Sequence, residues 1–209
     1  MRVLRAGDAA LLIETEAPHR LHAAVRGLGR TEIVDVVPGA GTVLVTTAPG
    51  ADLGRLGALL GDLPLPETST ASGEPLRVPV AYDGADLDEV ASITGLTRAQ
   101  VVERHAAAEY GVAYLGFSPG FGYLTGLDES LHVSRRDSPR TAVPAGSVAI
   151  AGPYGAIYPS PSPGGWRLLG RTTLRLWDPD REPPSLLQPG TRVRFEACAA
   201  DALPAETRA

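Results

Sequence analysis

The sequence contains no lysine, and all nineteen of its basic residues are arginine. A nucleotide-binding P-loop needs a lysine that reaches the phosphates, and Schiff-base catalysis needs a lysine amine. Both kinds of chemistry are therefore excluded for this chain. If the reaction consumes ATP, we expect another polypeptide to bind the nucleotide. Codon bias is a sufficient explanation for arginine in place of lysine, because arginine also serves on solvated surfaces. Whatever the cause, a chain without lysine cannot carry out lysine chemistry.

Cysteine is almost absent too. The single residue Cys198 excludes an intrachain disulfide and a cysteine metal cluster. No apolar run approaches the roughly 20 residues needed to span a bilayer, and the segment after Met1 lacks the apolar core of a signal peptide. The net charge of −5 comes without a basic block, which disfavours nucleic acid as a partner. We expect a cytoplasmic protein that binds neither nucleic acid nor a membrane.

The first 70 residues predict a small α+β domain. Apolar alternation favours a hairpin over residues 2–14 and strands over 33–37 and 42–47, while helical spacing follows Pro18 and Asp52. The order β-β-α-β-β-α is typical of helices packed on one face of an antiparallel sheet. Residues 64–75 are rich in proline, serine and threonine and predict a linker. The expected domains are therefore residues 1–70 and 76–209.

The second domain begins with an expected strand over 76–81 and two helices. One helix starts near Asp86 and ends at Gly95, and a capping box from Thr97 to Gln100 opens the other. After Gly111 the helical periodicity stops, and glycine and proline turns separate short apolar runs. These runs predict strands over residues 112–117, 147–151, 156–158, 166–170, 174–177 and 192–195. Many short strands of this kind are typical of a β-barrel.

Eleven glycines and seven prolines lie between Gly111 and Gly170. Glycine permits close approach and unusual backbone angles, and proline fixes φ, so this density predicts rigid, irregular loops that hold a shaped surface. Three motifs stand out in or beside this stretch, namely GFSPGFGYL at 116–124, PRTAVPAG at 139–146 and SPGGW at 162–166.

In this order the three motifs resemble the small subunit of bacterial ATP-dependent 5-oxoprolinase. The same family holds allophanate hydrolase subunit 1 and the sporulation kinase A inhibitor. The resemblance is strong from about residue 82 to 195 and weak before residue 72. It implies a carboxyltransferase-type, cyclophilin-like barrel for residues 76–209, and so an α+β fold for the whole chain.

The resemblance also implies a function. The chain would be the non-ATP-binding subunit of a complex that hydrolyses 5-oxoproline to glutamate, and it would be inactive alone. A homologous larger carboxyltransferase-like chain and a lactam-utilisation subunit would be its partners. ATP and Mg²⁺ would bind to a partner, and this chain would hold no cofactor and no metal.

Two residues are candidates for catalysis. His105 resembles the family histidine that precedes the glycine-rich motif, and a histidine can transfer a proton near neutral pH. A histidine near the end of a helix is also favoured for structural reasons alone. Arg140 belongs to the PRT motif and to a cluster with Arg135 and Arg136, and an arginine fork can bind a carboxylate or phosphate. The alternative for this cluster is ordinary surface pairing, for instance with Asp137.

The motifs supply the expected substrate-binding residues. Glycines can expose backbone N–H groups or let a ligand approach, and aromatic rings can line a pocket, although both also serve turns and cores. The predicted substrate-binding residues are Gly120, Phe121, Tyr123, Ser162, Gly164, Gly165 and Trp166.

One position departs from the family pattern. Tyr154 stands where relatives often carry a glutamine, and this substitution puts the shared substrate in doubt. Two other functions therefore stay open. The first is a non-enzymatic inhibitor of a sporulation-type histidine kinase, and the second is an amide carboxyl-transfer subunit related to urea or allophanate metabolism. A fold-level resemblance does not choose among the three.

Overall fold

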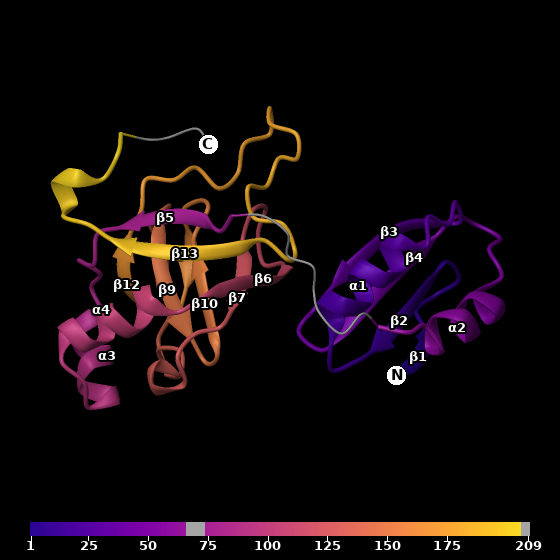
Figure 1. Cartoon of the computed structure of the whole chain (residues 1–209), viewed down its shortest axis with the longest axis horizontal. Helices are drawn as coiled ribbons and strands as arrows, with labels where there is room; N and C mark the ends of the chain where they lie inside the picture. Colours follow the sequence, from indigo (N-terminus) through magenta and orange to yellow (C-terminus); the bar gives the residue numbers. More distant parts are fainter. Residues whose placement is uncertain (66–73, 206–209) are drawn as a thin grey trace. The chain divides into compact units, whose positions relative to one another are not determined.

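The computed structural model describes residues 1–65 and 74–205. The chain divides into two compact units, Met1–Ala71 and Ser72–Ala209 (Figure 1). Most of the predicted linker over 64–75 lies outside the described residues.

The N-terminal unit is a four-stranded antiparallel sheet with the strand order β1-β2-β4-β3 and two helices. The predicted order of elements is confirmed: β1 Arg2–Arg5, β2 Ala10–Glu14, α1 Pro18–Gly27, β3 Ile33–Pro38, β4 Thr42–Thr47 and α2 Leu53–Gly61. The carboxylate of Asp52 caps α2 by accepting a hydrogen bond from the N–H of Arg55 at 3.0 Å.

Alternation along the central strands builds the core of this unit. Every second residue of β2 and β4 points to one face of the sheet, where both helices cover it. The resulting buried cluster consists of Leu11, Ile13, Leu21, Val25, Val36, Val43, Val45, Leu53, Leu56 and Leu60.

The second unit contains a seven-stranded sheet with the order β12-β9-β10-β7-β6-β13-β5. Its elements are β5 Leu76–Val80, α3 Leu87–Thr94, α4 Arg98–Ala107, β6 Tyr110–Leu115, β7 Gly122–Thr125, η1 Glu129–Leu131, β8 Arg140–Val143, β9 Ser147–Ala151, β10 Tyr154–Ile157, β11 Ser162–Gly164, β12 Arg167–Arg171, β13 Arg192–Ala197 and η2 Ala200–Ala202. Ala81, just after β5, and Arg171, the last residue of β12, exchange two backbone hydrogen bonds of 2.9 Å. Because these residues end the two outermost strands, the sheet curls into the nearly closed barrel that the sequence predicted (Figure 1).

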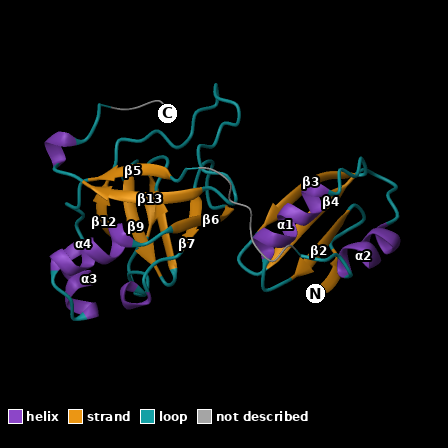
Figure 2. Cartoon of the chain, viewed as in Figure 1, coloured by secondary structure: helices purple, strands orange, loops and turns teal. Residues whose placement is uncertain are grey.

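Helices α3 and α4 lie together beside the barrel (Figure 2). The predicted capping box is present at the start of α4, where the Thr97 hydroxyl accepts from the Gln100 N–H and the Gln100 side chain accepts from the Thr97 N–H. Gly95 ends α3 in the left-handed conformation, as expected for a helix stop.

One predicted strand is wrong. Residues 174–177 form no strand, and Trp177 makes only an isolated bridge to Ser185. The opposite segment contains Pro183 and Pro184, which have no N–H to donate, so a regular ladder cannot form there. Strands β7, β8 and β11 were not predicted, because all three are short and β7 and β11 also contain glycine or proline.

Strand β9 is buried on both faces, and this divides the barrel unit into two apolar layers. Val148 and Ile150 belong to the main core inside the barrel. Ala149 and Ala151 point the other way, into a smaller cluster that contains residues of the glycine-rich motifs. The sheet therefore places the motifs on the face of β9 and β10 that lies outside the barrel core.

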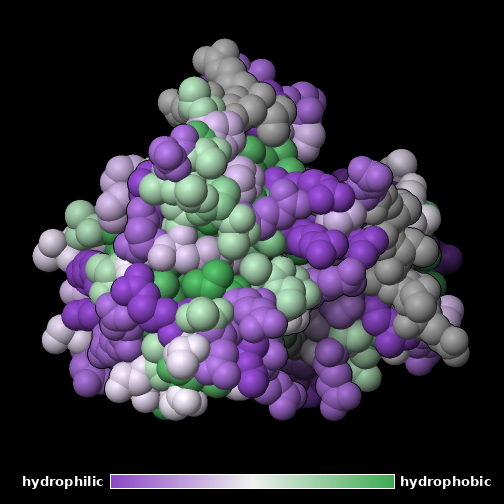
Figure 3. All heavy atoms as spheres, turned by 60° about the vertical axis from the view of Figure 1, so that its left-hand side comes forward, coloured by the Kyte–Doolittle hydropathy of each residue, from purple (hydrophilic) through white to green (hydrophobic). Residues whose placement is uncertain are grey.

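The surface shown in Figure 3 mixes polar and apolar side chains, and the most apolar colour is confined to small areas. Among residues 1–65 and 74–205, no helix is long and apolar enough to cross a membrane. The same residues hold no cluster of three or more potential metal ligands.

Candidate functional site

The GFSPGF motif forms a tight loop between β6 and β7. The Ser118 N–H donates to the Gly116 carbonyl at 2.8 Å, which closes a γ-turn around Phe117. Phe117 has a φ of 67° and is the one non-glycine residue with positive φ in the described part of the chain. The Phe121 N–H then donates to the Ser118 carbonyl at 3.0 Å, and Gly120, with a φ of 79°, occupies the position that a type II turn reserves for glycine.

Phe117 is held outward by this loop, and 61% of its surface is exposed. A phenylalanine with positive φ carries backbone strain of about 1–3 kcal/mol, and such strain persists where the surroundings fix the conformation. Strained residues of this kind concentrate at ligand-binding sites. The loop therefore presents an aromatic ring at a fixed place on the surface.

The first three residues of the SPGGW motif form β11, which pairs with β8 in a separate two-stranded sheet, and Gly165 and Trp166 follow it. Packing requires glycine at position 164, because a Cβ there would come within 2.3 Å of the Tyr158 hydroxyl oxygen. Gly165 differs, because a Cβ there would meet its nearest neighbour at an ordinary 3.6 Å. Close packing therefore requires only the first glycine of the pair.

The two motifs meet at a small cavity, which we call the aromatic cavity. Its volume is about 100 Å³, so it admits a small ring or side chain rather than a drug-sized ligand. Its lining residues are Phe117, Phe121, Tyr123, Arg135, Tyr158, Pro163, Gly164, Gly165 and Trp166.

The rings of this cavity pack edge to face. Phe121 is at the centre, with ring centroids 5.2 Å from Phe117, 5.2 Å from Tyr123, 5.3 Å from Tyr158 and 5.7 Å from Trp166. Each such pair adds about 0.5–1.5 kcal/mol beyond area burial, so the walls of the cavity are rigid. The glycines of the motifs let these rings approach, and the rings give the cavity its shape.

Alanine at position 164 tests the close packing of this wall. Because Tyr158 is buried and fixed by Phe121, we expect Gly164→Ala to lower the free energy of unfolding by about 1–3 kcal/mol. Gly165→Ala is the matched control and is expected to cost less than about 1 kcal/mol. Denaturant unfolding of both variants measures the difference, and equal costs would contradict the packing argument.

Two arginines of the PRT cluster bind a buried aspartate. Arg136 and Arg140 donate to Oδ1 of Asp86 at 2.9 and 2.6 Å, and the Leu168 N–H donates to Oδ2 at 2.7 Å. Burial raises the pKa of the Asp86 carboxyl, but the hydrogen bonds from Arg140 and Leu168 and the arginine charges outweigh it and hold the pKa below its ordinary value. Ion pairing with Asp137 was named as an example of the alternative for this cluster, but the shared partner of Arg136 and Arg140 is Asp86, which lies 50 or more residues earlier in the chain.

His105 lies inside the main core and has no exposed surface. Its Nδ1 is hydrogen-bonded to the Tyr82 hydroxyl at 2.8 Å, and its ring packs against Tyr110 and Phe195. Burial lowers its pKa to about 3, so the ring is neutral at physiological pH. These surroundings favour the structural alternative, and a catalytic role of His105 stays a prediction.

The structure brings some of the predicted site residues together. Phe121, Tyr123, Gly164, Gly165 and Trp166 all line the aromatic cavity. Gly120 and Ser162 lie beside it in the chain but not in its lining, and neither His105 nor Arg140 is part of it. That these residues bind substrate remains a prediction.

The sequence did not predict the roles of three residues at this site. Asp86 binds two of the arginines, and Arg135 and Tyr158 line the aromatic cavity. The sequence marked Asp86 only as the start of a helix. Its ion pairs with the arginines could not be predicted, because they join residues 50 or more positions apart. Tyr158 showed only as part of a short strand, although it belongs to the motif-bearing cluster.

Tyr154 does not line the aromatic cavity but contacts Tyr123, which does. Its ring packs edge to face against Tyr123, at a centroid distance of 5.8 Å, and against Tyr114 at 5.9 Å. Since Tyr123 lines the cavity, Tyr154 supports one wall from behind. Tyr154, the position at which we expected a departure from the family pattern, is thus a supporting residue and not a lining one.

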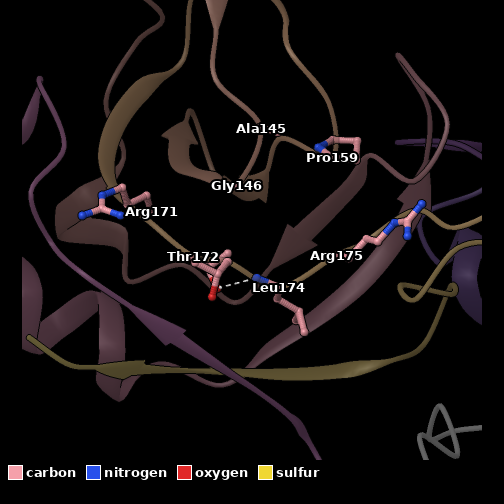
Figure 4. A pocket seen from close by; sticks show the side chains of 8 residues that line it. Ala145, Gly146, Pro159, Arg171, Thr172, Leu174 and Arg175 are labelled. Carbon is pink, nitrogen blue, oxygen red and sulfur yellow. Dashed lines mark hydrogen bonds between the residues drawn. The ribbon is translucent and has the colours of Figure 1, made fainter. Parts of the chain in front are cut away.

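A second cavity, of about 360 Å³, lies between the turn at Ala145–Gly146 and the segment 171–175 (Figure 4). The guanidinium groups of Arg171 and Arg175 lie on opposite sides of it and point away from one another. Arg171 donates to Asp83 at 2.9 Å, and Arg175 lies 3.5 Å from Asp178. This cavity contains none of the predicted site residues and no pair of converging charges.

Comparison with known proteins gives a consistent result. Residues 1–187 match the family model of the carboxyltransferase domain, subdomains C and D. The 5-oxoprolinase B chain of Escherichia coli O157:H7 is 41% identical over 201 residues, covering 90% of this chain and 92% of that protein. The protein of the same name from Haemophilus influenzae is 41% identical over 171 residues, and the match covers 78% of this chain and 79% of the H. influenzae protein.

A solved structure, that of TTHA0988, agrees with the fold. It is 38% identical, has a TM-score of 0.80, and matches 95% of this chain. This chain spans only 42% of the length of TTHA0988, so the relative carries a further polypeptide segment. Together with the family model and the near full-length relatives, these findings show that the chain belongs to the carboxyltransferase subdomain C and D family, alongside the 5-oxoprolinase B subunits.

Proposed function

We propose that this chain is the non-ATP-binding subunit of an ATP-dependent 5-oxoprolinase complex, which opens 5-oxoproline to glutamate. The observation that supports this most directly is that two separate family motifs build one small aromatic cavity in a chain 41% identical to 5-oxoprolinase B subunits. The partners in this proposal are a larger carboxyltransferase-like chain and a lactam-utilisation subunit, and ATP and Mg²⁺ bind to a partner.

Opening the lactam adds one water across the amide bond. The carbonyl carbon gains a hydroxyl group, and the ring nitrogen gains a proton as the C–N bond breaks. An unstrained amide is a poor electrophile, and transfer of the terminal phosphoryl group of ATP to its carbonyl oxygen makes the carbon easier to attack. ADP leaves in this transfer, and a second water releases the phosphoryl group as inorganic phosphate. The family's use of ATP fits this chemistry.

The aromatic cavity suits the recognition part of this reaction. Its rings can hold a small, flat ring and exclude water, and binding energy of that kind positions the substrate for the partner. Phe121, Tyr123 and Trp166 form the walls in this proposal. Arg140 does not contact the substrate in this proposal. Its hydrogen bond to Asp86 fixes the start of β8 and thereby the end of segment 135–140, which carries the three arginines.

The test is reconstitution with the two partners. We expect ADP release by the complex to depend on 5-oxoproline, and we expect calorimetry to detect no ATP binding to the isolated chain, since it has no lysine and no P-loop. A complex that hydrolyses ATP only with urea or another amide would show that the substrate is wrong. A chain that forms no complex but inhibits a histidine kinase would replace the enzymatic proposal with the regulatory one.

A further inference from the structure

The three arginines between β7 and β9 have different surroundings. Arg136 and Arg140 both donate to Asp86. Within the described part of the chain, each keeps one buried nitrogen without a hydrogen-bond partner, Nε of Arg136 and Nη1 of Arg140, but neither residue lines the aromatic cavity. Arg135 lines the aromatic cavity instead. Among residues 1–65 and 74–205, Arg135 takes part in no ion pair, although Asp137 is only two residues away. An arginine with its fork unoccupied, on the wall of a cavity, is available to a ligand.

The other lining residues leave the Arg135 charge uncompensated. None of the nine is an aspartate or glutamate, and Arg135 is the one charged residue among them. The positive charge of Arg135 acts on the hydroxyl groups of two nearby tyrosines. Burial raises the pKa of the Tyr158 and Tyr114 hydroxyls, and Arg135 partly opposes the rise at both. The guanidinium therefore lies close enough to the ring hydroxyls to act on the cavity electrostatically.

The chemistry of this arrangement is specific. Aromatic walls bind a flat or apolar ring, and a guanidinium binds a carboxylate through two parallel hydrogen bonds. A cavity of about 100 Å³ leaves room for one small ring and not for a nucleotide. The ligand that satisfies both features is a small cyclic molecule that carries one carboxylate.

We propose that Arg135 is the residue that binds the carboxylate of the cyclic amide, with the lactam ring held in the aromatic cavity against the exposed ring of Phe117. This rests on the proposed function for the identity of the substrate, and it assigns the recognition of the acid to Arg135 in place of Arg140. Arg135 is a binding residue that sets specificity between an acidic and a neutral lactam, and the bond-breaking groups belong elsewhere.

The experiment compares 5-oxoproline with 2-pyrrolidinone, which has the same lactam ring without the carboxylate. In the reconstituted complex, Arg135→Gln is expected to reduce the ratio of kcat/KM for the acid to that for the neutral lactam by about ten- to a hundredfold, mainly through KM for the acid. Arg135→Lys keeps a charge but loses the fork and is expected to recover only part of this ratio. Arg98→Gln, which removes an exposed partner of Asp88, is the matched control and should leave the ratio unchanged.

A second measurement separates this inference from the proposed function. Calorimetric titration of the full chain and the complex with each lactam reports binding without turnover. Arg135-dependent binding of the acid in a complex that does not hydrolyse it would overturn the proposed function and keep the assignment of Arg135. If Arg135→Gln binds and converts the acid as the wild type does, the assignment is wrong. If the wild type binds the acid and the neutral lactam equally, carboxylate recognition by this cavity is also wrong.

Discussion

Replacing Asp86 with asparagine is expected to lower the free energy of unfolding by about 3 kcal/mol, the largest loss we expect from one polar substitution in this chain. Asp86 is 1% exposed and accepts hydrogen bonds from two arginines and one backbone N–H. Asparagine keeps the shape but removes the negative charge, so Arg136 and Arg140 are left without their counter-ion. Both guanidinium groups retain some contact with solvent, which places the loss at the lower end of the range for breaking a buried ion pair.

Asp88→Asn is the matched control on the same helix. Its side chain is 75% exposed and pairs with Arg98 at the surface, where an ion pair contributes at most about 1 kcal/mol. Because the Asp86 side chain makes no helix-capping bond, the substitution does not disturb the start of α3. Denaturant unfolding of both variants gives the comparison, and a loss below about 1 kcal/mol for Asp86→Asn would mean that the buried network contributes no more than a surface pair.

The Asp86 network also connects folding to the cavity. Arg136 is the neighbour of Arg135 in the chain, and Arg140 begins β8, whose partner strand β11 carries the first three residues of the SPGGW motif. The backbone N–H of Arg136 donates to the Gly165 carbonyl at 2.8 Å. Loosening the two arginines would therefore free both the segment that carries Arg135 and the cavity wall at Gly165. The same variant should weaken ligand binding by more than its effect on global stability explains.

The sequence could predict those features that follow from local patterns. Alternation in β2 and β4, the Asp52 cap and the Thr97–Gln100 capping box each depend on residues a few positions apart. The barrel and the grouping of Phe121 with Trp166 could be predicted through the family motifs. Positive φ at Phe117 could not, because glycine or asparagine usually marks that conformation.

The choice among the three arginines could not be made from the sequence. Arg135, Arg136 and Arg140 lie within six residues, and only the fold decides which of them meets Asp86 and which meets the cavity. Asp86 itself lies 54 residues before Arg140, so no local signal connects the two. For the same reason His105 could be read as a catalytic or as a core residue, since Tyr82 and Phe195, which enclose its ring together with the nearby Tyr110, come from distant parts of the chain.

The stability of the protein is expected to fall by about 2 kcal/mol between pH 7 and pH 5 because of His105 alone. Its pKa is about 3 in the folded chain and close to 6.5 in the unfolded chain. Below pH 6.5 the unfolded chain therefore binds a proton that the folded chain does not, and this stabilises the unfolded state. The contribution is fully present above pH 6.5, and it is lost as the pH falls from 6.5 toward 3. Burial raises the pKa of both Tyr82 and Tyr110, so these neighbours do not titrate in this window.

His105→Gln tests both the pH dependence and the catalytic role. Glutamine keeps hydrogen-bonding capacity toward the Tyr82 hydroxyl but does not titrate, so the difference in unfolding free energy between wild type and variant should shrink as the pH falls from 7 to 5. Subtracting the variant removes the contributions of His19 and His22, whose pKa values burial also lowers. In the reconstituted complex at pH 7, a structural His105 predicts that folded His105→Gln keeps its turnover number. A variant that folds well but loses turnover by about a hundredfold or more would show instead that the ring takes part in proton transfer, and that the core around it opens during the reaction.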